Sequence, residues 1–171
     1  MKVFLIGFMA SGKTTLAESF SKLKKLRVYD LDKIIEKYTG CKVNEIFSEK
    51  GEDSFRQFEK YQLENFKFND KSIISVGGGT ACCFENMKMM NQMGKTVYLK
   101  TSLDILHRRL IKDNKRPLVS NNKNSLKKFI NSELKSREKY YKLANYTLSC
   151  DNLTLTQLTK NLESLYEKLQ N

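Results

Sequence analysis

The sequence is poor in the residues on which several classes of protein site depend. Its 171 residues include no tryptophan, one proline and one histidine. The single histidine, His107, excludes a catalytic histidine pair or a multi-histidine metal site within one chain. One proline and eight glycines exclude a collagen-like or proline-rich linker protein. The remaining composition, 40% apolar and 29% charged, is typical of a globular chain long enough to bury one substantial core.

Cysteine is also scarce, and its spacing is uninformative. Cys41, Cys82, Cys83 and Cys150 form no C-x-x-C pair, which excludes zinc-knuckle and thioredoxin patterns. We expect reduced thiols in a cytoplasmic protein, and the sequence assigns these cysteines no chemistry. The longest early apolar run, Val3 to Ala10, is too short to span a bilayer of ~30 Å, so no membrane partner is expected.

Positive charge exceeds negative charge, with 31 Lys and Arg against 19 Asp and Glu for a net charge of +12. Such an excess is a feature of nucleic-acid-binding proteins. Here the basic residues are spread along the chain among Glu and Asp, without a basic tail. The same excess suits an enzyme whose ligands are anions. Charge alone does not separate these classes; we expect no nucleic-acid partner.

Short apolar runs alternate with helical patterns along the chain. The runs predict five strands, at residues 2–6, 27–29, 72–76, 96–99 and 146–149. The periodicity predicts helices over residues 13–25, 31–38, 43–49, 52–68, 85–93, 103–111, 126–143 and 155–169. This alternation predicts an α/β fold with a mainly parallel sheet, whose ligands bind at the carboxyl ends of the strands.

The first strand runs into a phosphate-binding motif. Gly7 to Thr14 matches G-x-x-x-x-G-K-[ST] between a strand and a helix, which is the context that the motif requires. Its backbone N–H groups and the helix N-terminus favour an anion, Lys13 reaches the β- and γ-phosphates, and Thr14 ligates Mg²⁺. The alternative, a glycine-rich turn without a ligand, is weak in this context. The predicted ATP-binding residues here are Ala10, Ser11, Gly12, Lys13, Thr14 and Thr15.

Two carboxylates follow the second strand. Asp30 and Asp32 are two residues apart, and alternate residues of an extended stretch face the same side, so both carboxylates can face the phosphate loop. One can hold Mg²⁺ through water while the other accepts a hydroxyl proton. The alternative is that Asp caps the helix that begins at Leu31. Since Ser75 occupies a strand end where many P-loop proteins carry an acidic residue, Mg²⁺ would depend on Thr14 and Asp30.

Three arginines are candidates for holding anionic ligands. Arg56 and Arg137 could each clamp a carboxylate through two parallel hydrogen bonds. Arg116 lies in a polar loop, residues 112–124, and could close over ATP. Each also has an ordinary alternative: Arg56 paired with Glu52 or Glu59, and the other two solvated. We expect Arg108 and Arg109 to be solvated, and the alternative is that they reach ATP.

A run of three glycines follows the third strand. Gly77, Gly78 and Gly79 allow close approach of the backbone to a ligand, and the alternative is a plain turn.

Together these features resemble the shikimate kinase family, of the bacterial single-domain type, over essentially the whole chain. The matching segments, in order, are GFMASGKTT at 7–15, DLD at 30–32, GEDSFRQFE at 51–59, GGGT at 77–80, KRPLV at 115–119 and SREKYY at 136–141. The resemblance implies one P-loop kinase domain over residues 1–171, with a three-layer fold and a five-stranded parallel sheet. It also implies a substrate-binding lobe at about 32–60 and a lid at about 112–124.

The resemblance further implies transfer of the ATP γ-phosphoryl group to the 3-hydroxyl of shikimate, in the pathway to chorismate and aromatic amino acids. Asp32 would be the base, assisted by Lys13 and Arg116, with Mg²⁺ on Thr14 and Asp30. Shikimate would be held by Asp32, Arg56, Gly77, Gly78, Gly79 and Arg137. ATP and shikimate are then the expected partners of a monomer.

Two departures from the family pattern stand out. Ala10 replaces a usual glycine, where we expect the methyl group to be tolerated, and a proline expected near Asp151 in the adenine-binding loop is absent. A related kinase acting on gluconate is the first alternative, because it would share the P-loop and lid. A catalytically silent P-loop protein that binds nucleotide or RNA is the second, although intact Lys13, Asp32, Arg56 and Arg137 argue against it.

Overall fold

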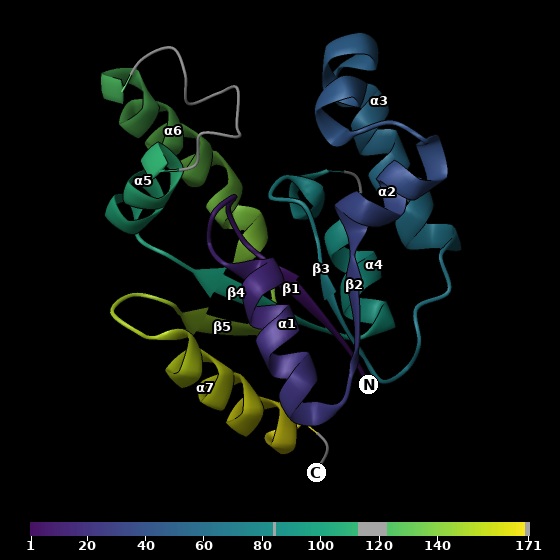
Figure 1. Ribbon diagram of the computed structural model, residues 1–171, viewed down its shortest axis with the longest axis vertical. Helices are drawn as coiled ribbons and strands as arrows, with labels where there is room; N and C mark the ends of the chain where they lie inside the picture. Colours follow the sequence, from purple (N-terminus) through teal and green to yellow (C-terminus); the bar gives the residue numbers. More distant parts are fainter. Residues whose placement is uncertain (84, 113–122, 170–171) are drawn as a thin grey trace.

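Five parallel strands form one sheet at the centre of the molecule, in the order β2-β3-β1-β4-β5 (Figure 1). The computed structural model describes every residue except 84, 113–122 and 170–171. The strands are β1 (Lys2–Ile6), β2 (Arg27–Asp30), β3 (Ser72–Ser75), β4 (Lys95–Lys100) and β5 (Tyr146–Ser149). All four pairings are parallel, which confirms the predicted α/β class.

The helices lie close to where the periodicity predicts them. They are α1 (Lys13–Lys24), α2 (Leu31–Thr39), α3 (Val43–Asn65), α4 (Asn86–Met93), α5 (Leu103–Lys112), α6 (Lys123–Tyr141) and α7 (Leu155–Lys168). Gly51 has φ 78° and kinks α3 where the sequence predicts two helices to meet. Helix α3 ends at Asn65, so the predicted helix to Phe68 is too long. A short 3₁₀ turn, η1 (Thr80–Cys82), was not predicted.

Alternate residues of the strands face two separate halves of the core. Val3 and Leu5 of β1 pack with the apolar residues of α1 and α7, among them Phe20 and Leu162. These two helices lie together on one face of the sheet (Figure 1). The period of two in a fully buried strand therefore fixes a helical layer on each side.

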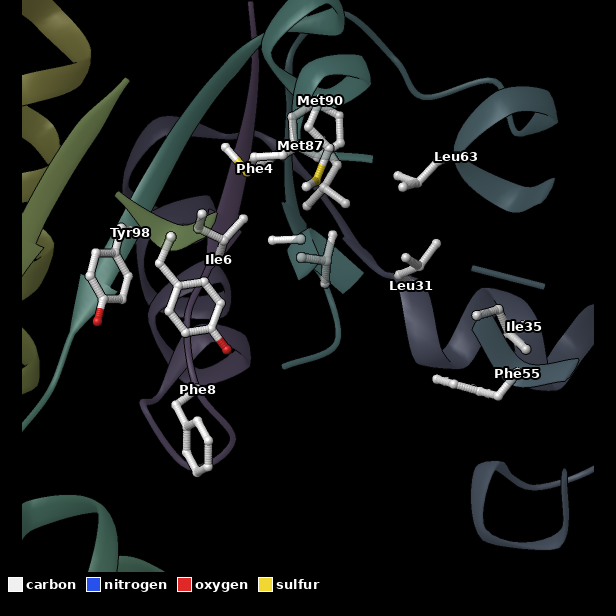
Figure 2. Packing of buried hydrophobic residues seen from close by; sticks show 14 of the residues in the cluster. Phe4, Ile6, Phe8, Leu31, Ile35, Phe55, Leu63, Met87, Met90 and Tyr98 are labelled. Carbon is white, nitrogen blue, oxygen red and sulfur yellow. The ribbon is translucent and has the colours of Figure 1, made fainter. Parts of the chain in front are cut away.

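The other half of the core extends from the sheet into the lobe formed by α2 and α3. Figure 2 shows Phe4 of β1 beside Met87 and Met90 of α4, with Ile6 and Leu31 farther along the same cluster. Ile35 and Phe55 continue it between α2 and α3. Because the lobe shares this apolar cluster with the sheet, its side chains hold a defined position relative to the strand ends.

The strand register brings the predicted site to one edge of the sheet. Ser75 of β3 lies opposite Leu5 of β1 and Asp30 of β2. Gly7 and Gly77 then follow two residues after these pairings, on neighbouring strands. Beyond this edge, α2 and α3 stand on one side and α5 and α6 on the other (Figure 1).

Among the described residues, no helix is long and apolar enough to cross a membrane.

The phosphate loop contains a non-glycine residue in the left-handed region. Ala10 has φ 62°, whereas Gly7 and Gly12 account for the other positive φ angles of the loop. A left-handed conformation costs an L-residue roughly 1–2 kcal/mol relative to glycine. The loop accepts the methyl group of Ala10 in this conformation, at a cost in backbone free energy that the sequence alone did not reveal.

Ala10→Gly is therefore expected to stabilise the fold by about 0.5–1 kcal/mol, since the relief of left-handed strain exceeds the added entropy of the unfolded chain. Urea unfolding followed by circular dichroism measures this change. Ala17→Gly is the matched control, because Ala17 is buried within helix α1 and the same substitution there should destabilise by about 1 kcal/mol. Destabilisation at both positions would contradict the argument.

Candidate functional site

The phosphate loop lines a cavity of about 490 Å³ at the carboxyl edge of the sheet. The Lys13 Nζ atom donates hydrogen bonds of 2.9 Å to the carbonyls of Gly7 and Phe8, so the lysine folds back over its own loop. All the predicted ATP-binding residues that the structure describes line this cavity: Ala10, Ser11, Gly12, Lys13, Thr14 and Thr15. Arg116, the remaining one, lies outside the described residues, as do residues 113–122 of the expected lid.

Thr14 and Asp30 meet in this cavity, as the sequence predicts. The Thr14 hydroxyl donates to Asp30 Oδ2 at 3.0 Å and lies 3.2 Å from the Ser75 hydroxyl. The other oxygen of Asp30 accepts the backbone N–H groups of Asp32 and Lys33 at the start of α2. The capping interpretation of Asp30 is therefore correct, and the same carboxylate also faces the phosphate loop through Thr14.

Asp32 lines the same cavity, on the first turn of α2. Its Oδ1 atom is buried and has no hydrogen-bond partner among the described residues. Burial, together with the negative charges of Asp30 and Glu59, raises the pKa of Asp32 to about 6, against the opposing effect of Lys13 and Arg56. A carboxyl group with this pKa and a free buried oxygen is suited to accept a proton near neutral pH.

A second cavity, of about 290 Å³, contains both predicted carboxylate clamps. Arg56 of α3 and Arg137 of α6 line it together with Gly79, which follows β3. A Cβ atom at Gly79 would overlap the Arg56 guanidinium, so any other residue there would require the guanidinium to shift. Tertiary structure thus brings two arginines that are 81 residues apart to one cavity.

Arg56 also forms ion pairs with Glu52 and Glu59, which the sequence offered as the alternative to a binding role. Its Nε and Nη2 atoms donate to Glu52 Oε1 at 3.1 and 2.7 Å, and its Nη1 atom donates to Glu59 Oε2 at 2.6 Å. Glu52 is largely exposed, whereas the Glu59 side chain has no exposed surface. Arg56 therefore has one exposed partner, Glu52, and one fully buried partner, Glu59.

Sequence reasoning missed the role of Glu59 in the site. Its Oε1 atom accepts a hydrogen bond from the hydroxyl of Thr80, the first residue of η1. The same carboxylate lies so close to Gly77 that a Cβ there would be 2.6 Å from Oε1. The only available signal was its position three residues after Arg56, which the sequence argument treated as an alternative to function.

Two further residues of the site were also missed. The Tyr141 hydroxyl donates to the carbonyl of Gly78, and its buried ring stacks on Tyr98 at 5.0 Å. Tyr141 lies one turn after Arg137 on α6, so this bond ties the arginine-bearing helix to the glycine run. Arg109, expected to be solvated, donates to the Ala10 carbonyl at 3.0 Å and lines the phosphate cavity.

Comparison with known proteins identifies the origin of this arrangement. The family model described as shikimate kinase matches residues 9–168. The chain is 37% identical to a shikimate kinase of Phocaeicola vulgatus over 171 residues, covering 98% of each. It belongs to the shikimate kinase family. The resemblance inferred from the six sequence segments is thereby confirmed.

Solved structures agree with this membership. A crystal structure of shikimate kinase from Bacteroides thetaiotaomicron superposes with a TM-score of 0.90 at 35% identity, covering 98% of each chain. A shikimate kinase from Acinetobacter baumannii in complex with shikimate gives a TM-score of 0.87 at 28% identity, covering 98% of this chain and 93% of that one. As a member of the shikimate kinase family, the chain is an ATP-dependent kinase.

The raised pKa of Asp32 predicts a pH-dependent cost to folding. Its ordinary value is 3.8 and its value in the fold is about 6, so ionised Asp32 destabilises the fold. The cost is absent below pH 4, grows as the pH rises from about 4 to about 6, and reaches about 2–3 kcal/mol above that. Asp32→Asn should therefore stabilise the protein at pH 8 and much less at pH 4.5, as measured by urea unfolding.

Asp53→Asn is the control for this experiment, because it removes a carboxylate from an exposed position of α3. It should change stability by no more than about 0.5 kcal/mol at either pH. Equal stabilisation by Asp32→Asn at both pH values would contradict the electrostatic origin of the effect.

Proposed function

We propose that this chain transfers the γ-phosphoryl group of ATP to the 3-hydroxyl of shikimate, giving shikimate 3-phosphate and ADP. One observation carries the proposal. The phosphate-loop cavity and the arginine-lined cavity both border the glycine run, with Gly77 and Gly78 on one side and Gly79 on the other. A phosphoryl donor in the first cavity and a carboxylic acid in the second would meet at this run, beside Asp32.

The second cavity suits one carboxylate. Two guanidinium groups present planar donors, which match a carboxylate better than ammonium groups do. We propose that the substrate carboxylate takes the place of Glu52 on Arg56, because Glu52 is exposed and can be exchanged. Glu59 stays in place as the buried partner that aims the guanidinium. Arg137, which lies over the Phe8 ring at 5.5 Å and forms an ion pair with Glu133 on its own helix, supplies the second guanidinium group.

Asp32 is the proposed base. Its Oδ1, which no hydrogen bond from the described residues occupies, is available to accept the proton of the attacking hydroxyl, and its pKa of about 6 keeps it ionised at neutral pH. Lys13 would turn from the carbonyls of Gly7 and Phe8 to the transferring phosphoryl group, where negative charge is concentrated. Arg116, outside the described residues, is proposed to close over ATP from a lid at 112–124.

Thr14 and Asp30 are the proposed ligands of Mg²⁺. A hydroxyl and a carboxylate oxygen 3.0 Å apart are hard oxygen donors of the kind that Mg²⁺ prefers, and this ion takes its remaining ligands from water and phosphates. When bound, Mg²⁺ neutralises charge on the phosphate groups of ATP. Ser75 lies next to the pair and is positioned to orient it.

We also propose that the chain works as a monomer in the cytoplasm and forms a single kinase domain over residues 1–171. Its four free cysteines are in keeping with a reducing compartment. Residues 32–60, which include α2 and most of α3, form the proposed substrate-binding lobe. The shared apolar cluster that contains Ile35 and Phe55 supports its attachment to the sheet.

A coupled ADP-release assay with ATP and Mg²⁺ tests the proposed reaction. ADP release is expected with shikimate and not with gluconate or nucleoside monophosphates, because only shikimate presents a ring carboxylate to both arginines. ADP release with gluconate would favour the alternative kinase. A folded protein that binds ATP but releases ADP with none of these acceptors would overturn the proposal.

Arg137→Lys tests the carboxylate clamp. The variant is expected to raise KM for shikimate about tenfold or more with little change in KM for ATP, because a point charge replaces a planar pair of donors. Arg108→Lys, on the exposed face of α5, is the matched control and should leave both constants unchanged. An equal rise in both KM values would show that Arg137 does not bind the substrate carboxylate. Arg56→Lys is less informative, because it also alters the ion pair with the buried Glu59.

A further inference from the structure

Two adjacent thiols lie in the wall of the arginine-lined cavity. Cys82 ends η1 and Cys83 follows it, and both line the cavity with Arg56 and Arg137. Both cysteines are free and partly exposed. The proposed reaction uses neither of them, so this cavity carries a chemical group that its function does not explain.

The pair differs from an isolated cysteine because two adjacent cysteines line the same cavity. Both thiols feel the charges of Arg56 and Arg137, and the Cys83 thiol acts on the pKa of Cys82. Among the described residues, no group of three or more His, Cys, Asp or Glu could hold a metal ion. The site therefore offers two soft ligands and no third, which suits an acceptor that needs only two.

Trivalent arsenic bearing one aryl group is such an acceptor. An aryl arsenoxide condenses with two thiols: two S–H bonds and the As–O bonding are lost, two As–S bonds form, and the oxygen leaves as water with both protons. Nothing is oxidised or reduced. Burial raises the pKa of Cys82 to about 11, which slows alkylating reagents that need a thiolate but does not prevent this condensation of neutral thiols.

We propose that Cys82 and Cys83 form a two-thiol site for trivalent aryl arsenicals, inside the cavity that we assign to the substrate carboxylate. The overlap with shikimate rests on the proposed function; the thiol site itself rests on the cavity. An aryl arsenoxide that carries a carboxylate should bind best, because Arg56 and Arg137 border the same space.

Binding of phenylarsenoxide and 4-carboxyphenylarsenoxide to the full chain tests the site, with intact-mass analysis and peptide mapping of the adduct. One aryl-arsenic group per chain, bridging residues 82 and 83, is expected. Cys82→Ser and Cys83→Ser should each lower the affinity by about a hundredfold or more, because the second As–S bond becomes intramolecular only when both thiols are present. If either Ser variant misfolds, the Ala variant at that position replaces it. Cys41→Ser, between α2 and α3, is the matched control and should bind as the unaltered chain does.

The carboxylate and the competition with shikimate test the rest of the proposal. The carboxyl group should improve affinity about tenfold, and Arg137→Leu should remove this gain. Shikimate should slow the loss of kinase activity that the aryl arsenoxide causes. The loss is measured as the fraction of each variant's own activity before the reagent is added. Adduct formation elsewhere, or unchanged affinity in both single cysteine variants, would overturn the thiol site. If the protein shows no shikimate-dependent ADP release, the proposed function fails, while adduct mapping still decides the thiol site.

Discussion

The hydrogen bonds of the buried Glu59 carboxylate are the interaction on which the arginine-lined cavity depends. The carboxylate has no exposed surface, and it accepts hydrogen bonds from Arg56 on its own helix and from Thr80 after the glycine run. Burial raises its pKa, while Arg56 and Thr80 oppose that shift by favouring the charged form. A charge in such a place persists only when it is paired. The lobe helix and the glycine run are therefore fixed to each other through one side chain.

The same charges set the chemistry of Asp32. Its neighbours include two negative groups, Asp30 and Glu59, and two positive ones, Lys13 and Arg56. Burial and the negative groups prevail, so the pKa rises to about 6, which is close to the value that a general base needs at neutral pH. Asp30 is less suited to act as the base, because its oxygens accept hydrogen bonds from Thr14 and from the first turn of α2. Two carboxylates two residues apart thus acquire different tasks from their surroundings.

Features carried by contiguous residues could be predicted from the sequence. The five strands, the phosphate loop and the break at Gly51 follow from local patterns, and the strand ends placed Thr14 and Asp30 at one edge. The sequence could not show that Arg109 donates to Ala10 or that Tyr141 holds Gly78, because these bonds join residues 99 and 63 positions apart. It left the pairing of Arg56 with Glu59 as an alternative to a functional role. In the fold, the pairing aims the arginine at the cavity.

By itself the sequence determined the α/β class, the anion-binding loop and the residue types available for phosphoryl transfer, since each depends on periodicity or on a motif of fixed spacing. It also determined the family, through six short segments in a fixed order. Only the tertiary structure decided which side chains share a cavity, that the pKa of Asp32 is raised, and that Cys82 and Cys83 line one cavity with the arginines. Those properties depend on burial and on the distance between charges from separate elements, and both arise only when the sheet, the lobe and helix α6 pack together.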